Sequence, residues 1–445
     1  MIIPKSSLEI LGLDSKLQLK FILFTVILIS SLLYYSEIFA IDEIDGTLNY
    51  NNNNNMHASD FVFSNVTNIT NNTKDSVYAQ IAANDNDVYV VWQESVTGNS
   101  YGNNYDIYFK KSADNGTTFS KPINLSNNTG FSEHPQIAVS KNGIFIIWAD
   151  NTDSNNTEIM FTKSVDNGTA FSKPINLSNN LQNSNNQEIS AFNENVYIVW
   201  QNTDQNNNNN KNSSIMFKGS IDSGNTFNDT IEVATDTNDA YPKVNSFEDY
   251  VYIVWNSENN KISQDNNNNN GLFFIKSSDK GNNFENSIRI AHYNFGESQI
   301  AVNGNEVFIV WGGLYEKNIN DIYFVKSDDN GTSFTDPYTI QEKVTKPESK
   351  VHSNKINHPT NVEITNNDPA YIVWQDKTSK ENQDISITNI KNDFQSTGIL
   401  NLSNNTGISE CPQIAVSKNY IYVVWEDITP GNHEIFFTKG QSINK

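Results

Sequence analysis

Seven short apolar segments that end in tryptophan recur along this chain at intervals of 51 to 63 residues. A typical one is Val-Tyr-Ile-Val-Trp200. Together they hold every tryptophan of the protein: Trp92, Trp148, Trp200, Trp255, Trp311, Trp374 and Trp425. A repeat of about 50 residues that carries several strands per unit is typical of a β-propeller. The repeat also separates what occurs seven times, which is scaffold, from what occurs once.

One unit, residues 134–178, shows how each repeat is built. Residues 136–140 alternate in polarity and predict a strand, and Lys141-Asn142-Gly143 predicts a hairpin turn. Residues 144–148 form the most apolar segment, as expected of a strand buried on both faces. Residues 158–163 and 173–178 predict a third and a fourth strand. Four antiparallel strands with short connections make one propeller blade.

The two ends of the repeat region predict how the ring closes. The seventh unit stops after its third strand, at Lys439, whereas residues 61–70 match the fourth strand of other units. We therefore expect 61–70 to be the outer strand of the last blade, where it covers an open sheet edge. The prediction is an all-β, seven-bladed propeller of four-stranded antiparallel blades, with six blades as the less favoured count. It forms a single domain over 61–440, with a tail at 441–445.

The N-terminal region lies outside the repeats. Residues 21–35 are apolar, follow Lys16 and Lys20, and lead to a plausible cleavage site at Ile38-Phe39-Ala40. This pattern predicts a secretory signal peptide over 1–40, the alternative being an uncleaved N-terminal anchor that would tie the protein to a membrane. Residues 41–60 are rich in asparagine and predict a disordered linker. Either reading places the propeller in a secreted or cell-surface location.

The charge balance excludes one class of partner. The chain has 51 acidic and 29 basic residues and a formal net charge of −22. Such a surface repels phosphate backbones, so nucleic-acid binding is not expected, while loose binding of cations such as calcium is favoured. Cys411 is the single cysteine, and no cluster of histidine, cysteine and aspartate has zinc spacing. We therefore predict no cofactor and no metal site.

A second motif recurs in five units, between the expected third and fourth strands. It reads Ser-x-Asp-x-Gly-x-[Thr/Ser/Asn]-Phe, with alanine at the seventh place in the second copy. The carboxylate can accept backbone N–H groups within the turn, the glycine permits a positive φ, and the phenylalanine packs back between strands. Its key residues are Asp114, Gly116, Phe119, Asp166, Gly168, Phe171, Asp222, Gly224, Phe227, Asp279, Gly281, Phe284, Asp329, Gly331 and Phe334.

These turns resemble the Asp-box, or bacterial neuraminidase repeat, of the sialidase superfamily, in which the last position is usually tryptophan. With the tryptophan strands, the resemblance covers roughly residues 60–440. It implies that the Asp-box is a structural turn on the face away from the active site. Propellers of that family have six blades, so the seven repeats of this chain depart from the pattern.

The resemblance would also imply hydrolysis of sialic acid, for which sialidases use three arginines, a Tyr–Glu nucleophile pair and an aspartate acid/base. This chain has one arginine, Arg289, so we expect a non-catalytic member. Other glycoside chemistry needs two placed carboxylates. Carboxylates recur after the tryptophans and at the starts of the third strands, and repetition favours structural roles for them: Glu94, Asp150, Asp376, Glu426, Asp427, Asp106, Glu158, Asp321, Asp384 and Glu434.

The linkers that precede each first strand are the most varied part of the repeat. They should lie opposite the Asp-boxes, around the mouth of the central channel. The equivalent positions hold Tyr78, His134, Asn186, Tyr241, Glu297 and Cys411, with His358 nearby in the sixth unit.

The leading hypothesis is an extracellular, non-catalytic binding or adhesion module for a surface glycan or a protein. The alternatives are a glycoside hydrolase or lyase that uses acidic residues at the mouth, and a structural cell-envelope component. The oligomeric state stays open.

Overall fold

The computed structural model describes most of the repeat region, and nothing before residue 61. The described residues are 61–96, 104–152, 156–204, 213–235, 237, 240–257, 271–292, 298–315, 319–340, 359–364, 370–376, 382–390 and 398–442. All of them belong to the unit formed by residues 56–445. The predicted signal peptide and Asn-rich linker lie outside the described residues. Within the described residues, no helix is long and apolar enough to cross a membrane.

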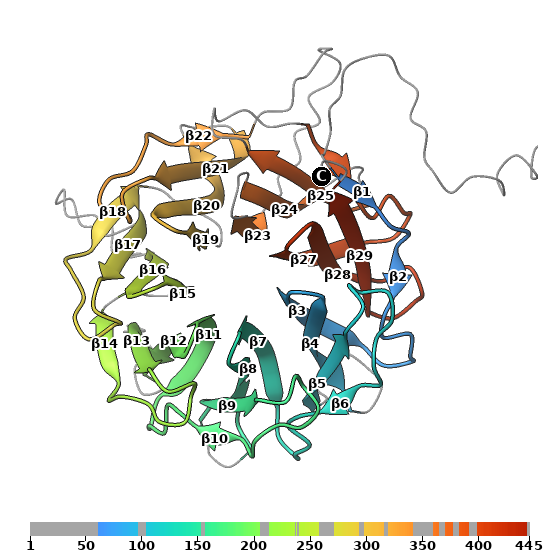
Figure 1. The fold of residues 1–445 in the computed structure, drawn as a ribbon, viewed down its shortest axis with the longest axis horizontal. Coiled ribbons are helices and arrows are strands. Elements are labelled where there is room, and N and C mark those ends of the chain that lie inside the picture. Colours follow the sequence, from blue (N-terminus) through green and yellow to red (C-terminus); the bar gives the residue numbers. More distant parts are fainter. Residues whose placement is uncertain are drawn as a thin grey trace, which may run out of the picture. The chain divides into compact units, whose positions relative to one another are not determined.

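Seven antiparallel sheets stand around a central channel, so the predicted seven-bladed propeller is confirmed (Figure 1). The strands nearest the channel are β3 (Ser76–Asn84), β7 (Ser132–Ser140), β11 (Asn183–Phe192), β15 (Lys243–Phe247), β19 (Ser298–Asn303), β23 (Pro359–Ile364) and β27 (Ser409–Ser417). The second strands are β4 (Asp87–Ser95), β8 (Gly143–Asp150), β12 (Asn195–Thr203), β16 (Tyr250–Ser257), β20 (Glu306–Tyr315), β24 (Ala370–Asp376) and β28 (Tyr420–Asp427).

The two outer layers complete each blade. The third strands are β5 (Tyr105–Ser112), β9 (Glu158–Ser164), β13 (Ser213–Ser220), β17 (Gly271–Ser277), β21 (Ile319–Ser327), β25 (Asp384–Ile390) and β29 (Glu434–Ser442). The outermost strands of blades 1 to 6 are β6 (Ile123–Asn124), β10 (Ile175–Asn176), β14 (Ile231–Ala234), β18 (Ile288–Ala291), β22 (Tyr338–Thr339) and β26 (Leu400–Asn401). We number the blades from the one that contains β3 to the one that contains β27.

The seventh blade is completed by the start of the propeller sequence, as predicted. Both β1 (Phe61–Phe63) and β2 (Thr67–Asn68) pair antiparallel with β29. Phe61 also packs edge-to-face on Tyr371 of blade 6, with ring centroids 5.6 Å apart. The first strand of the propeller thus joins the last blade and seals it against its neighbour.

The core lies between the blades rather than inside any one of them. Seven hydrophobic clusters each combine side chains of two adjacent blades. The second strands contribute most, because both of their faces are covered by neighbouring sheets. Every tryptophan is buried, with no more than 4% of its surface exposed. This explains why the tryptophan segments are apolar throughout rather than alternating.

The five Asp-box turns fasten blades 1 to 5, each to the blade before it. In the first box, Asp114 accepts backbone N–H groups of Thr117 (3.0 Å) and Thr118 (2.8 Å) and the hydroxyl of Ser112 (2.7 Å). These hydrogen bonds, led by that of the Thr118 backbone, lower the pKa of Asp114 to about 2. Gly116 has φ +72°, and a Cβ there would lie 2.5 Å from the Phe437 ring of blade 7. The box therefore needs glycine both for its turn and for close blade contact.

A lysine of the third strand completes this fastening at four interfaces. Lys163 of blade 2, for example, donates from Nζ to the Ser223 carbonyl (2.8 Å) and the Asn225 side chain (2.6 Å) in the box of blade 3. Lys111, Lys276 and Lys439 reach the next box in the same way. Lys326 faces blade 6, which lacks the motif, and instead pairs with Glu306 and Asp328 of its own blade.

Candidate functional site

The carboxylates that follow the tryptophans belong mostly to the scaffold. Asp150 accepts the indole N–H of Trp148 (2.9 Å) and the hydroxyl of Ser132 (2.8 Å). Asp427 does the same for Trp425 and Ser409, and Asn202 does it for Trp200 and Ser184. An uncharged asparagine can take the position, so the role is hydrogen-bond acceptance rather than chemistry.

The carboxylates that open the third strands also have scaffold partners. Asp106 accepts hydrogen bonds from the amide of Asn124 (2.8 Å) on the outer strand β6 and from the hydroxyl of Ser126 (2.9 Å) just after that strand. Asp384 receives the equivalent bonds from Asn401 and Ser403. These partners are the Asn and Ser of Asn-x-Ser motifs, which here tie the third strand to the fourth.

The channel mouth is built differently, from a repeated bulge that carries a different side chain in each blade. Tyr78, His134, Asn186 and Cys411 have φ between +51° and +53°. Each sits at a break in register between the first and second strands of its blade. Non-glycine residues in the left-handed region are uncommon, and such backbone strain concentrates at functional sites.

The remaining predicted mouth residues divide into two groups. Tyr241 does not adopt the positive φ of the other four. Strand β15 begins two residues after it and pairs with β16 without a bulge. It stays close to the mouth, since the amide of Asn186 donates to the carbonyl of the preceding Ala240 (3.2 Å). Glu297 and His358 lie outside the described residues.

Side chains from the preceding blade hold two of the bulges in place. The backbone N–H of His134 donates to Gln93 Oε1 at 2.7 Å, and that of Tyr78 donates to Glu426 Oε1 at the same distance. Gln93 and Glu426 are equivalent, because each directly follows the tryptophan of its blade. A neutral amide therefore suffices for the bulge, and Glu426 brings a carboxylate where none is required.

Glu426 is a buried acid, with 4% of its surface exposed. Burial, reinforced by the charge of Glu410, raises the pKa of Glu426 to about 8, although the Tyr78 N–H opposes the shift. The same neighbourhood, burial first and Glu426 next, raises the pKa of Tyr78 to about 12. The Tyr78 hydroxyl therefore remains a hydrogen-bond donor across the physiological range.

Tyr78 and His134 form an aromatic pair across the interface of blades 1 and 2. Their ring centroids are 4.4 Å apart and their planes are inclined at 64°. Tyr78 is 43% exposed, and His134 is also exposed. The mouth thus presents two adjoining rings, with Cys411 and Glu426 of blade 7 on their other side.

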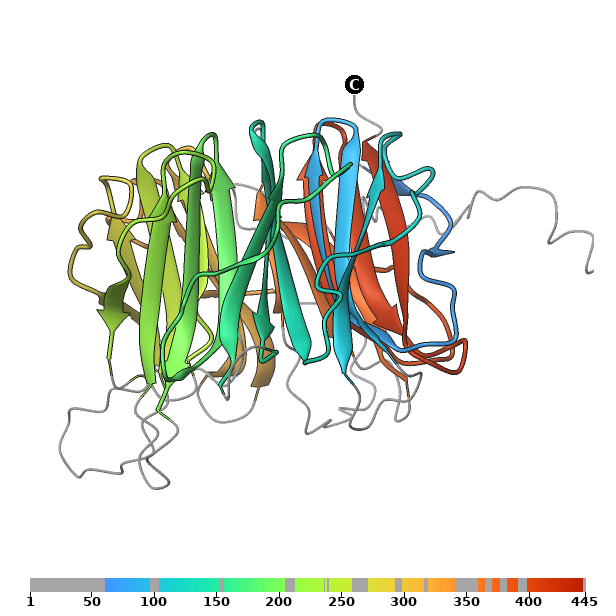
Figure 2. The ribbon, with the colours of Figure 1, turned by 90° about the horizontal axis from the view of Figure 1, so that it is seen from below.

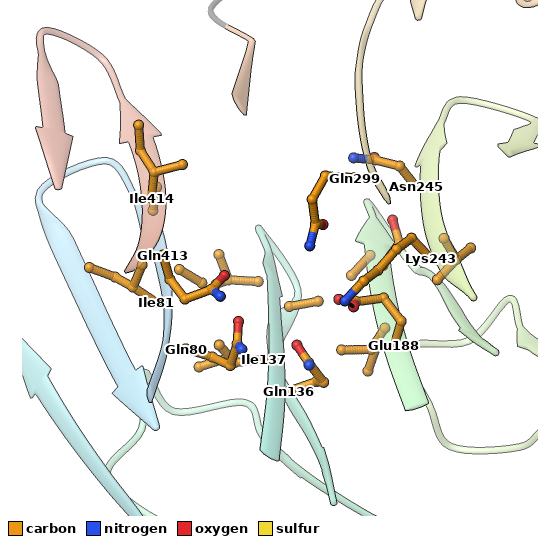
Figure 3. Close-up of a pocket in the computed structure, with 18 of the residues that line it drawn as sticks. Gln80, Ile81, Gln136, Ile137, Glu188, Lys243, Asn245, Gln299, Gln413 and Ile414 are labelled. Carbon is orange, nitrogen blue, oxygen red and sulfur yellow. Dashed lines mark hydrogen bonds and ion pairs between the residues drawn. The ribbon is translucent and has the colours of Figure 1, made fainter. Parts of the chain in front are cut away.

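Below the bulges, the first strands line a channel cavity of about 270 Å³ (Figure 3). The residue two places after each aligned mouth position points inward, and the described ones are Gln80, Gln136, Glu188, Lys243, Gln299 and Gln413. Glu188 and Lys243 form an ion pair at 2.9 Å. The amides of the other four offer both donors and acceptors to a ligand.

One constellation at the mouth was missed by the sequence reasoning. Glu410, Glu426 and His433 each offer a ligand atom, and these atoms lie within 4.8 Å of one another. They belong to blade 7, and Asp75 of blade 1 contacts His433. The signal available in the sequence was Glu426 itself, a carboxylate at a position where blades 1, 3 and 6 have glutamine. Spacing rules did not reveal it, because its three residues come from separate segments of blade 7 and match no zinc motif.

Comparisons with known proteins found similar folds. No family model matches the chain, and no curated protein matches it. Trypanosoma rangeli sialidase is similar with a TM-score of 0.49 at 12% identity, over 82% of this chain and 55% of the sialidase. A Dyadobacter fermentans protein of unknown function gives 0.48 at 12% identity, over 85% and 99%. The K499G mutant of Streptococcus pneumoniae NanB sialidase gives 0.44 at 10% identity, over 83% and 68%. The chain spans about half the length of the trypanosome sialidases it matches.

Proposed function

We propose that the protein is an extracellular, non-catalytic binding module that holds a surface glycan or a protein partner at the mouth of its channel. The observation that carries the proposal is the Tyr78–His134 pair, two exposed rings 4.4 Å apart on strained bulges at the mouth. The extracellular location rests on the N-terminal sequence, which predicts a secretory leader.

The chemistry around the pair suits a ligand rich in hydroxyl groups. Binding sites combine apolar and aromatic surface with a few placed polar groups. Here the rings stand above a cavity lined by the amides of Gln80, Gln136, Gln299 and Gln413, which can both donate and accept. The net charge of −22 disfavours a polyanionic ligand. A neutral glycan or a polar loop of a partner protein fits these features best.

A second candidate function, glycoside hydrolysis, is favoured by one specific observation. Glu426 has a pKa raised to about 8 by burial, and Glu410 offers a second carboxylate within 4.8 Å. A carboxyl group with a raised pKa beside a second carboxyl group is an arrangement that glycosidases use. Under this alternative, Glu426 is the general acid and Glu410 the nucleophile.

Glycan-array binding by the purified protein tests the binding proposal. We expect selective retention of neutral glycans, and a loss of at least 10-fold in affinity for Tyr78→Ala and His134→Ala. Tyr338→Ala is the matched control, because Tyr338 is a tyrosine of similar exposure, 39%, on the outer strand β22. Unchanged binding by both mouth variants would reject the proposal.

Turnover assays with synthetic glycosides separate the second candidate from the first. A binding module releases no sugar, whereas a hydrolase releases it and loses that activity in Glu426→Gln. Retained binding with no turnover in the wild type would exclude the hydrolase.

A further inference from the structure

We propose that Glu410, Glu426 and His433 bind a divalent transition-metal ion at the mouth of the channel. One ligand atom of each residue lies within 4.8 Å of the other two. The inference goes beyond the proposed function, because it requires neither a glycan nor a protein partner.

The register of blade 7 brings the two carboxylates together. Glu410 of β27 and Glu426 of β28 are directly paired in the antiparallel ladder, so their side chains leave the sheet on the same face. His433 directly precedes β29, the next strand of the blade. Two neighbouring strands and the residue before the third therefore present one ligand each at the same end of the sheet.

Asp75 of blade 1 orients the imidazole. Its Oδ1 accepts the backbone N–H of His433 at 3.0 Å and lies 3.4 Å from the ring Nδ1. With Nδ1 facing Asp75, Nε2 is the ring nitrogen turned towards Glu410, 3.9 Å from its Oε1. Metal-binding histidines usually donate their other ring N–H to a carboxylate or carbonyl in this way. This contact supports a metal site independently of the two glutamates.

The distances and charges suit a single ion. Two ligands that each lie about 2.1 Å from one ion are at most roughly 4.2 Å apart. The 3.9 Å separation of Nε2 and Oε1 fits that limit, and the widest separation closes with a shift of under about 1 Å. Two carboxyl groups face each other here, one of them only 4% exposed, and a divalent cation between them would offset the cost of ionising both.

The donor set also limits which metal it accepts. One imidazole nitrogen with two carboxylates suits zinc, manganese or iron. Calcium takes six to eight oxygen ligands and gains little from an imidazole. Zinc is therefore the appropriate probe, and calcium the comparison.

Blade 2 supplies an internal control for the arrangement. Glu133 occupies the position of Glu410, but it faces Ala149 where blade 7 has Glu426. Thr157 precedes the third strand there, in the place of His433. The same backbone thus carries one acid without its metal-binding partners.

Titration of the purified protein with zinc, measured by calorimetry, tests the proposal. The absorption spectrum of bound cobalt(II) shows how the metal is coordinated. We expect one zinc ion per chain, and at least 10-fold weaker binding by Glu410→Gln and His433→Ala. Asp75→Asn, which changes a positioning residue, should weaken binding 10- to 100-fold and alter the cobalt(II) spectrum. Glu133→Gln and His292→Ala, at a matched acid and an exposed histidine outside the site, should bind zinc as the wild type does.

Three outcomes would overturn the inference. The wild type could fail to bind zinc, His433→Ala could bind zinc as tightly as the wild type does, or the wild type could bind calcium as tightly as it binds zinc. Urea unfolding without metal shows which variants remain folded. Glu426→Gln keeps an oxygen for the Tyr78 N–H and should fold. If Glu426→Gln does not fold, the zinc affinity of Glu410→Gln tests the site instead. The Glu410 side chain is 34% exposed and can be replaced without disturbing the core.

Discussion

The two ends of the blades use repetition in opposite ways. At the Asp-box end, five turns repeat the same residues and make the same contacts with the preceding blade. At the mouth end, four bulges repeat the same backbone angle but carry tyrosine, histidine, asparagine and cysteine. Figure 2 shows the sheets edge-on, with both ends of the blades in view. The difference teaches that contact between blades constrains side chains, whereas an open surface can keep a fixed backbone while its side chains vary.

The comparison predicts a large stability gap between aromatic residues of the two ends. Phe217 is 2% exposed, stacks on Tyr197 and meets Phe284 of the next box edge-to-face. Phe217→Ala should lower the free energy of unfolding by about 3–5 kcal/mol, through lost burial and a cavity. Tyr241 near the mouth is 40% exposed, and Tyr241→Ala should cost under about 1 kcal/mol. Denaturant unfolding of both variants measures the gap, and equal costs would break the comparison.

The box glycines offer a sharper test. Gly281 has φ +80°, and a Cβ there would lie 2.4 Å from Phe217 Cζ. Gly281→Ala should destabilise by about 2–4 kcal/mol, from backbone strain and overpacking together. Gly304 has φ +59° with open space around it, so Gly304→Ala carries the strain alone, about 1 kcal/mol. Similar thermal midpoints for the two variants would mean that blade contact does not constrain the box.

A smaller effect is expected at the lysines that reach the boxes. Lys163→Met keeps the aliphatic stem but removes the Nζ bonds to Ser223 and Asn225 of blade 3. The loss should be about 1 kcal/mol, since a typical hydrogen bond contributes that much. Lys121→Met, at an exposed lysine before β6, is the control and should match the wild type in the same urea titration.

The smallest prediction concerns acid. Hydrogen bonds from the Thr118 backbone and other box groups lower the pKa of Asp114 to about 2 from 3.8. The folded state therefore binds this proton less readily than the unfolded chain, so the stabilisation is present above pH 3.8 and is lost as pH falls towards 2. In Asp114→Asn, the free energy of unfolding should depend less on pH in that window. Asp336→Asn, at an exposed aspartate outside the boxes, is the control and should keep the pH dependence of the wild type. A steeper acid decline in Asp114→Asn would contradict the assignment.

The sequence predicted the scaffold well because its determinants are local. A segment like the one that ends at Trp92 predicts a strand buried on both faces, and Asp114 with Gly116 predicts a turn. Each pattern is contained in a few consecutive residues. The closing strand at 61–70 was predictable because it matched a repeated pattern. The number of blades and the way the ring closes could therefore be predicted by aligning the repeats with one another.

The mouth was only partly predictable, because its geometry depends on contacts between distant segments. Alignment selected Tyr78 and His134 but could not show their rings in contact or their positive φ. The pairing of Asp75 with His433 joins residues 358 apart in sequence and exists only after the ring has closed. The sequence does not separate Glu426 from the other repeated acids, because only the structure shows that its neighbour Asp427 takes the shared scaffold role. Tyr241 failed to follow the alignment because β15 lacks the bulge.

The pairing of β1 with β29 has a consequence for biosynthesis. A ribosome makes the chain from its N-terminus, so Phe61–Phe63 emerges hundreds of residues before its partner, as the 374-residue separation of Ser64 and Thr438 shows. Until β29 has been made, the nascent polypeptide cannot complete its toroid. Blades 1 to 6 can pack on one another before that point, so closure of the ring is a late step of folding rather than the first.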